Sequence, residues 1–166
     1  MATHRLYIPA IAFLPDTSGN CYPKPSSVND TNDFVPREVL AFKDSGTKVS
    51  AGATFQIPVN YVGTPKLQVI WKSTATSGDV VWDVDFVAVA VSETLDPAAA
   101  DESETVTTTT NGTALDRNES EVTPTGSTFA VEDVVLLKVS RDGLDAADTM
   151  AAEALFEGVA FEYADV

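Results

Sequence analysis

The stretch that decides the fold is residues 53–91, which read ATFQIPVNYVGTPKLQVIWKSTATSGDVVWDVDFVAVAV. Two parts of it, residues 66–72 and 80–91, alternate apolar and polar side chains with a period of two. Such long alternation, rich in valine, tryptophan and phenylalanine, is typical of half-buried antiparallel strands. The small polar segment between them, residues 73–79, has the composition of a turn. The sequence therefore predicts a hairpin that belongs to a β-sandwich.

The hairpin places large aromatic residues on the apolar faces of its two strands. Trp71 and Trp82 project from neighbouring strands in this arrangement, and Phe86 follows on the same face as Trp82. The last apolar run of the chain contributes Phe161. We expect these four side chains to form the structural core.

The rest of the chain repeats this pattern of short strands and turns. Further strand-like runs lie at residues 5–14, 34–43, 53–58, 103–110, 117–122, 133–141 and 154–163. Asn111-Gly112 is the strongest turn signal, because both central positions of a type I′ turn have positive φ. Single helical turns are predicted only from Asp96 onward and within residues 145–154. About eight short strands with little or no helix predict an all-β antiparallel sandwich.

A chain of 166 residues fits one compact domain. We expect residues 1–52 to supply an N-terminal strand and an extended arm or loop, and residues 53–166 to form the body. The least structured part is residues 21–33, which are rich in proline, serine, asparagine and aspartate. No apolar run reaches the roughly 18 residues that a membrane helix needs, so we expect no membrane partner. Cys21 is the only cysteine, which fits a cytoplasmic protein and leaves a free thiol or an intermolecular bridge open.

The net charge of −15 is unevenly distributed along the chain. Residues 1–75 hold seven Lys/Arg and five Asp/Glu, whereas residues 76–166 hold three and twenty, which gives +2 and −17. Nucleic-acid binding requires a basic surface, so this composition argues against a nucleic-acid partner. Two interpretations remain open: two differently charged regions in space, or interleaved strands with a uniformly acidic surface.

Catalytic chemistry finds little support in the sequence. His4 is the only histidine, and its place near the terminus is a poor one for a preorganised general base. One histidine and one cysteine are too few for a zinc site. The chain also lacks a glycine-rich phosphate loop and a nucleophile elbow. We therefore predict no catalytic residues, no cofactor and no enzymatic activity.

Two groups of carboxylates are candidate sites. Asp83 and Asp85 lie on the same face of one strand, where they could act as an acid/base pair or bind a hard cation. Because valines flank them and provide no platform for a sugar, the favoured interpretation is a polar outer face.

The second group surrounds a glycine. Asp142, Asp145 and Asp148 are spaced three residues apart, which makes them candidate metal ligands, but the spacing differs from that of an EF-hand loop. The favoured interpretation is a loop that an ion pair between Arg141 and Asp148 holds in place.

A series of short motifs between residues 55 and 163 carries a resemblance to a known family. The motifs are FQIP at 55–58 followed by Tyr61, LQVIW at 67–71, GDVVW at 78–82, SETLDP at 92–97, VLLKVSR at 135–141, and Asp148-Thr149 before the last strand. In this order they resemble jelly-roll virion proteins of tailed bacteriophages, which are capsid decoration (cement) proteins or parts of head and tail fibres. The resemblance implies a homotrimeric jelly-roll without enzymatic activity or cofactor, and it does not cover the first fifty residues.

The leading functional hypothesis is a phage capsid decoration protein on the virion surface, assembled in the host cytoplasm. It would bind the major capsid protein or another virion protein and stabilise the head by mass action. The less acidic N-terminal segment would make the contact, through Arg5, Tyr7, Phe13 and Lys24. The alternatives are a receptor-binding head of a phage fibre and a carbohydrate-binding β-sandwich module.

Overall fold

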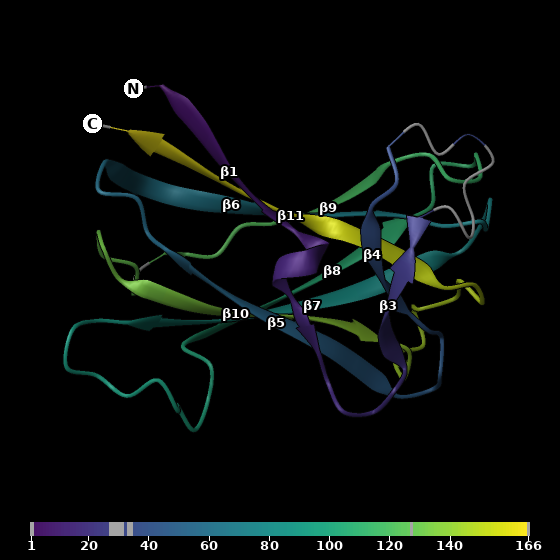
Figure 1. Cartoon of the computed structure of the whole chain (residues 1–166), viewed down its shortest axis with the longest axis horizontal. Coiled ribbons are helices and arrows are strands. Elements are labelled where there is room, and N and C mark those ends of the chain that lie inside the picture. Colours follow the sequence, from purple (N-terminus) through teal and green to yellow (C-terminus); the bar gives the residue numbers. More distant parts are fainter. Residues whose placement is uncertain (1, 27–31, 33–34, 127, 166) are drawn as a thin grey trace.

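The computed structural model describes residues 2–26, 32, 35–126 and 128–165. Eleven strands in these residues form two antiparallel sheets that pack face to face (Figure 1). The predicted fold class, an all-β antiparallel sandwich of jelly-roll type, is confirmed. The strands are β1 (Thr3–Pro9), β2 (Leu14–Pro15), β3 (Cys21–Pro25), β4 (Glu38–Phe42), β5 (Lys48–Gln56), β6 (Tyr61–Lys72), β7 (Asp79–Val89), β8 (Glu102–Thr109), β9 (Asn118–Val122), β10 (Val134–Asp142) and β11 (Ala154–Asp165).

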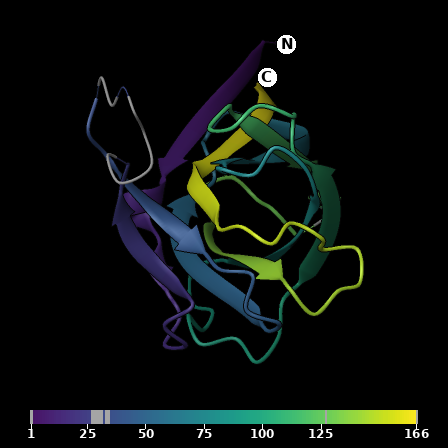
Figure 2. The same ribbon diagram turned by 90° about the vertical axis from the view of Figure 1, so that its right-hand side faces the viewer.

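The first sheet has the order β3-β4-β11-β6-β9, and β1 also pairs with β11. The long strand β11 serves two partners along one edge, since β4 pairs with its start and β1 with its remainder. This pairing brings the N- and C-terminal strands side by side (Figure 2). The second sheet has the order β2-β5-β10-β7-β8. A 3-10 turn, η1, spans Ala10–Ala12, and neither of the predicted helical turns forms, since residues 96–100 and 145–154 contain no helix.

The core lies between the two sheets. Trp71 and Trp82 are fully buried with ring centroids 6.2 Å apart, and Phe86 and Phe161 are buried as well. Trp71 comes from the first sheet and Trp82 from the second, so the two rings meet across the sandwich. Each aromatic side chain of this size removes about 150–250 Å² of surface from water, which makes this contact a main source of stability.

The predicted hairpin of residues 66–91 is wrong. Strand β6 pairs with β11 and β9, whereas β7 pairs with β10 and β8 in the opposite sheet. The connection at residues 73–78 therefore crosses from one sheet to the other. Alternation of apolar side chains shows which face of a strand is buried, but both a hairpin and a crossing connection satisfy the same alternation.

The predicted type I′ turn at Asn111-Gly112 is also wrong. Gly112 has a φ of 89°, but Asn111 is not among the described residues with positive φ. The Oδ1 of Asn111 accepts a hydrogen bond from the backbone N–H of Thr113, and the Asn111 backbone N–H donates to Oδ1 of Asn118. These contacts guide the chain from β8 in the second sheet to β9 in the first.

The N-terminal part of the chain belongs to the sandwich. Strand β1 pairs with β11, and residues 21–25, predicted as part of a loop or arm, form β3 against β4. Residues 27–31, 33 and 34 lie outside the described residues. Cys21 is buried, and burial, with a smaller contribution from the charge of Asp16, raises the pKa of its thiol to about 12. No helix of the described residues is both long enough and apolar enough to cross a membrane.

Candidate functional site

Basic residues gather on the first sheet. Seven of the ten Lys and Arg residues lie in its strands or directly beside them: Arg5, Lys24, Arg37, Lys43, Lys66, Lys72 and Arg117. The other three, Lys48, Lys138 and Arg141, belong to the second sheet. Both sheets nevertheless combine strands from residues 1–75 with strands from residues 76–166, so the two halves of the sequence interleave, as the second interpretation expected.

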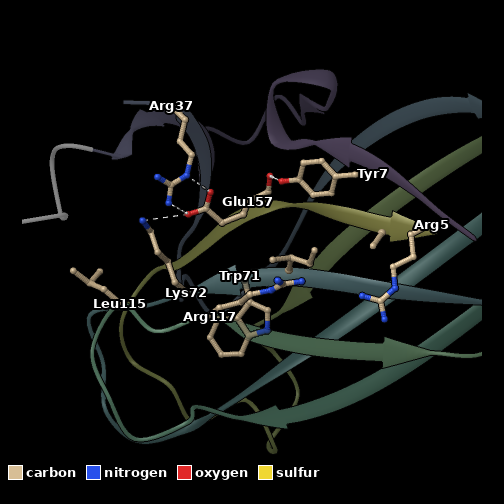
Figure 3. A pocket seen from close by; sticks show the side chains of 10 residues that line it. Arg5, Tyr7, Arg37, Trp71, Lys72, Leu115, Arg117 and Glu157 are labelled. Carbon is tan, nitrogen blue, oxygen red and sulfur yellow. Dashed lines mark hydrogen bonds and ion pairs between the residues drawn. The ribbon is translucent and has the colours of Figure 1, made fainter. Parts of the chain in front are cut away.

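A pocket of about 410 Å³ opens among these basic residues, and we call it the sheet pocket (Figure 3). Its residues come from β1, β11, β6 and the segments that precede β4 and β9. The lining residues are Arg5, Tyr7, Arg37, Ile70, Trp71, Lys72, Leu115, Arg117, Glu157 and Ala160.

A β-bulge shapes the centre of the sheet pocket. In the pairing of β11 with β6, Phe156 faces Trp71 and Gly158 faces Ile70, so Glu157 is an extra residue without a partner in β6. Gly158 has a φ of 149°, and a Cβ at this position would lie 2.4 Å from the carbonyl oxygen of Ile8. Only glycine permits this close approach of β1 to β11.

The bulge presents Glu157 to two cations. Arg37 donates to both carboxylate oxygens of Glu157, from Nε at 2.6 Å and from Nη2 at 2.7 Å. The Nζ of Lys72 lies 3.2 Å from Oε1 of the same carboxylate. Tyr7 donates its hydroxyl to the backbone carbonyl oxygen of Glu157 at 2.8 Å, and burial followed by the charge of Glu157 raises the pKa of Tyr7. Glu157 is therefore fixed in position by charge-assisted hydrogen bonds.

Two further arginines complete the sheet pocket. Arg5 donates from Nε to Oε2 of Glu162 at 2.7 Å, and Arg117 pairs through Nη2 with Glu119. The two side chains are 51% and 59% exposed, respectively. Figure 3 shows both guanidinium groups away from the cluster that Arg37 and Lys72 form around Glu157. Their remaining N–H groups are thus accessible to a molecule that enters the pocket.

The apolar part of the sheet pocket consists of Ile70, Ala160 and Leu115. Trp71 also contributes to the lining, but its side chain is fully buried and donates from Nε1 to Oγ of Ser120 at 2.9 Å. Its ring therefore belongs to the core. Tyr7 is the exposed aromatic side chain among the lining residues.

Asp83 and Asp85 lie on the same face of β7, and each pairs with a different lysine. Asp83 pairs with Lys48 at 2.5 Å and accepts a hydrogen bond from Thr105. Asp85 pairs with Lys138 at 2.7 Å; burial opposes ionisation, but hydrogen bonds from Lys138 and Ser103 outweigh it and lower the pKa of Asp85. Each carboxylate is bound by a lysine of its own, as expected for a polar outer face.

The three aspartates around Gly143 also have separate partners. Asp142 accepts from the backbone N–H of Leu144, and Asp145 accepts from that of Ala147. Asp148 pairs with Arg141. Among the described residues, no group of three or more His, Cys, Asp or Glu side chains is arranged to hold a metal ion.

The four residues predicted to contact a capsid do not form one surface. Phe13 is buried in the core with its ring centroid 4.8 Å from that of Phe156, and Lys24 pairs with Glu153 at 2.7 Å. Arg5 and Tyr7 do line the sheet pocket.

Sequence reasoning did not assign Arg37, Lys72, Arg117 or Glu157 to a site. These residues are far apart in the sequence, and no local motif connects them. The one available signal was the excess of basic residues over acidic residues in the first 75 positions. In the structure, most of these basic residues lie on the first sheet.

No protein-family model matches the sequence, and no curated protein matches it either. Solved structures share the fold. The CBM36-1 domain of a multidomain xylanase from the hindgut metagenome of Trinervitermes trinervoides aligns with a TM-score of 0.51 and 13% identity, over 98% of this chain and 100% of that one. A family 35 carbohydrate binding module from Clostridium thermocellum aligns with a TM-score of 0.55 and 9% identity, over 95% and 97%. CBM35 from Cellvibrio japonicus Abf62 aligns with a TM-score of 0.51 and 9% identity, over 98% and 99%.

These likenesses overturn the leading functional hypothesis. The expectation of a capsid decoration protein is wrong, because the three structures just described, which match 95–98% of this chain, are carbohydrate-binding modules. The alternative of a carbohydrate-binding β-sandwich module fits this finding better. The homotrimer, the virion location and the resemblance to phage proteins are not tested by these likenesses and stay predictions.

Proposed function

We propose that the protein is a non-catalytic carbohydrate-binding module, and that a sugar chain binds in the sheet pocket. The observation that carries the proposal is the pocket itself, because its size and its side chains suit a sugar. The fold supports the proposal, since modules whose names state carbohydrate binding share it over their full length.

The chemistry of the lining residues matches that of a sugar. Sugar hydroxyl groups donate and accept hydrogen bonds, and the C–H faces of the ring pack against aromatic side chains. Arg5 and Arg117 offer fixed donors, and the half-exposed ring of Tyr7 offers an apolar face. A volume of about 410 Å³ lies within the range of small-molecule sites, which are typically about 300–1,000 Å³.

Binding without hydrolysis is the activity that these residues favour. Hydrolysis of a glycosidic bond usually requires two carboxyl groups, about 5–9.5 Å apart, on either side of the bond. Glu157 is the one carboxylate among the lining residues, and Arg37 and Lys72 already bind it. A single carboxylate held in this way provides neither a general acid nor a nucleophile partner.

Calorimetric titration with a panel of oligosaccharides tests the proposal. The panel contains neutral hexasaccharides of xylose, glucose and mannose, together with hexagalacturonate. We expect at least one to bind, and we expect chromatography to recover it intact after prolonged incubation. Tyr7→Ala should weaken binding roughly three- to tenfold through loss of ring packing. Leu14→Ala, an exposed apolar residue on β2 of the other sheet, is the control and should bind like the wild type.

Two outcomes would contradict the proposal. The first is a lack of binding to every oligosaccharide by a folded protein. The second is binding that Tyr7→Ala and Leu14→Ala leave equally unchanged, which would locate the sugar outside the sheet pocket.

A further inference from the structure

We infer that the sheet pocket selects a sugar that carries a negative charge, a carboxylate or a sulfate, and that Arg5 and Arg117 bind this group. The inference rests on the proposed function, because it specifies the ligand of the same pocket. It is carried by the contrast between the charge of the pocket and the charge of the whole chain.

The sheet pocket is basic within an acidic protein. Four of the chain's ten Lys and Arg residues line it, against one carboxylate, whereas the chain as a whole carries a net charge of −15. The neighbouring Glu162 and Glu119 pair with Arg5 and Arg117, and even with these two included the cations outnumber the carboxylates by four to three. An anionic group that approaches the protein thus finds attraction in the pocket and repulsion over the acidic remainder.

The two sides of the pocket have different roles. On one side Arg37 and Lys72 bind Glu157, which satisfies that carboxylate and fixes the bulge. On the other side, Arg5 donates to Glu162 from Nε alone among the described contacts, and Arg117 forms an ion pair with Glu119 through Nη2. A guanidinium has five N–H donors, so both arginines keep donors for a ligand.

Arginine is also the suitable cation for this ligand chemistry. Its planar group matches the two oxygens of a carboxylate or a sulfate, and such bidentate contacts are stronger and more specific than those of a point charge. A neutral sugar hydroxyl gains less from the same donors. The pocket therefore binds a charged sugar more tightly than a neutral sugar that makes the same number of hydrogen bonds.

The salt dependence of binding follows from the position of the charges. At about 0.1 M salt the Debye length is about 10 Å, so acidic groups far from the pocket are largely screened, whereas contacts of the half-exposed Arg5 and Arg117 with a bound anion are screened only in part. Raising the salt to about 0.5 M should then weaken the binding of an anionic sugar and leave that of a neutral sugar nearly unchanged.

The experiment compares three probes by calorimetric titration of the full chain. Hexagalacturonate supplies carboxylates, a sulfated maltohexaose supplies sulfates, and xylohexaose is neutral. We expect one or both anionic probes to bind at least tenfold more tightly than xylohexaose, and preference between them identifies the anion. Arg5→Gln and Arg117→Gln should each weaken the anionic probe roughly 10- to 100-fold, the range for a charged hydrogen bond.

Lys66→Gln is the matched control for loss of one positive charge. Lys66 lies on β6 of the same sheet, pairs with Glu121 and does not line the sheet pocket. We expect it to change the affinity less than threefold. Thermal unfolding of all three variants verifies that they remain folded, and since the two pocket arginines are more than half exposed, their substitution should leave the transition nearly unchanged.

The outcomes separate this inference from the proposed function. If xylohexaose binds as tightly as the anionic probes, the anionic preference is wrong and the binding module stands. If an anionic probe binds but Lys66→Gln weakens it as much as Arg117→Gln does, the attraction is general and the assignment to the pocket is wrong. If none of the three probes binds but the glucose or mannose hexasaccharide does, the inference fails and the binding module stands; if no oligosaccharide binds at all, both fail.

Discussion

Arg141 and Asp148 form an ion pair that is completely buried inside the sandwich. Nη2 of Arg141 lies 2.7 Å from Oδ1 of Asp148, and Nε lies 3.0 Å from Oδ2. The guanidinium also donates to the backbone carbonyl oxygens of Phe42, Ala152 and Met150. One side chain on β10 thus holds the loop that leads to β11, both through the Asp148 carboxylate and through backbone carbonyl groups.

Breaking this pair should be costly, because it leaves one charge buried and unpaired. We expect Asp148→Asn to lower the free energy of unfolding by about 3–5 kcal/mol, measured by urea denaturation. Lys138→Met is the control on the same strand, since Lys138 is half exposed and pairs with Asp85 at the surface. The control should cost about 1 kcal/mol or less. Equal effects of the two variants would contradict the structural role of the buried pair.

The two core tryptophans should respond differently to substitution by phenylalanine. Trp71 donates from Nε1 to Oγ of Ser120, whereas Nε1 of Trp82 is buried without a hydrogen-bond partner among the described residues. Trp71→Phe therefore leaves the Ser120 hydroxyl unsatisfied and should cost about 1–3 kcal/mol more than Trp82→Phe. Thermal and urea unfolding measure the difference. A larger cost for Trp82→Phe would be inconsistent with the hydrogen bond at Trp71.

The sequence predicted the positions of the strands and the residues of the core better than it predicted which strands pair with one another. Alternation identified the buried faces around Trp71 and Trp82, because burial of one face is a property of a single strand. Which strands pair depends on contacts between distant segments, so the hairpin of residues 66–91 was wrong. The sheet pocket could not be predicted from the sequence for the same reason. Arg5, Arg37 and Glu157 come to line one pocket only when β1, β4 and β11 are assembled.

The pH dependence of stability should change when Glu153 is replaced. Burial alone would raise the pKa of Glu153, but hydrogen bonds from Lys24 and Tyr22 outweigh it and lower that pKa below its ordinary value of 4.5. A carboxyl with a lowered pKa in the folded state stabilises the protein above pH 4.5, and this contribution disappears as the pH falls through the folded-state pKa. The same hydrogen bond with Glu153 raises the pKa of Tyr22 to about 12.

We therefore expect Glu153→Gln to lower the free energy of unfolding at neutral pH by about 1 kcal/mol or less, since the pair with Lys24 is partly exposed. Below pH 4.5 the difference between wild type and variant should shrink toward zero. Urea denaturation across this pH range measures it. A difference that grows in acid would contradict the lowered pKa of Glu153.

Gly158 connects the fold to the proposed site. A Cβ at residue 158 would meet the carbonyl oxygen of Ile8 at 2.4 Å, and the φ of 149° is itself unfavourable for any other residue. We expect Gly158→Ala to cost about 2 kcal/mol or more and to move β1 away from β11. Because β1 carries Arg5 and Tyr7, sugar binding should weaken together with stability.

Gly52→Ala is the control. Its Cβ would lie 3.5 Å from the carbonyl oxygen of Leu137, an ordinary contact distance, on a strand of the second sheet. We expect the control to retain binding. If Gly158→Ala unfolded at the wild-type urea concentration and bound sugar normally, then the bulge would not be what positions β1 at the sheet pocket.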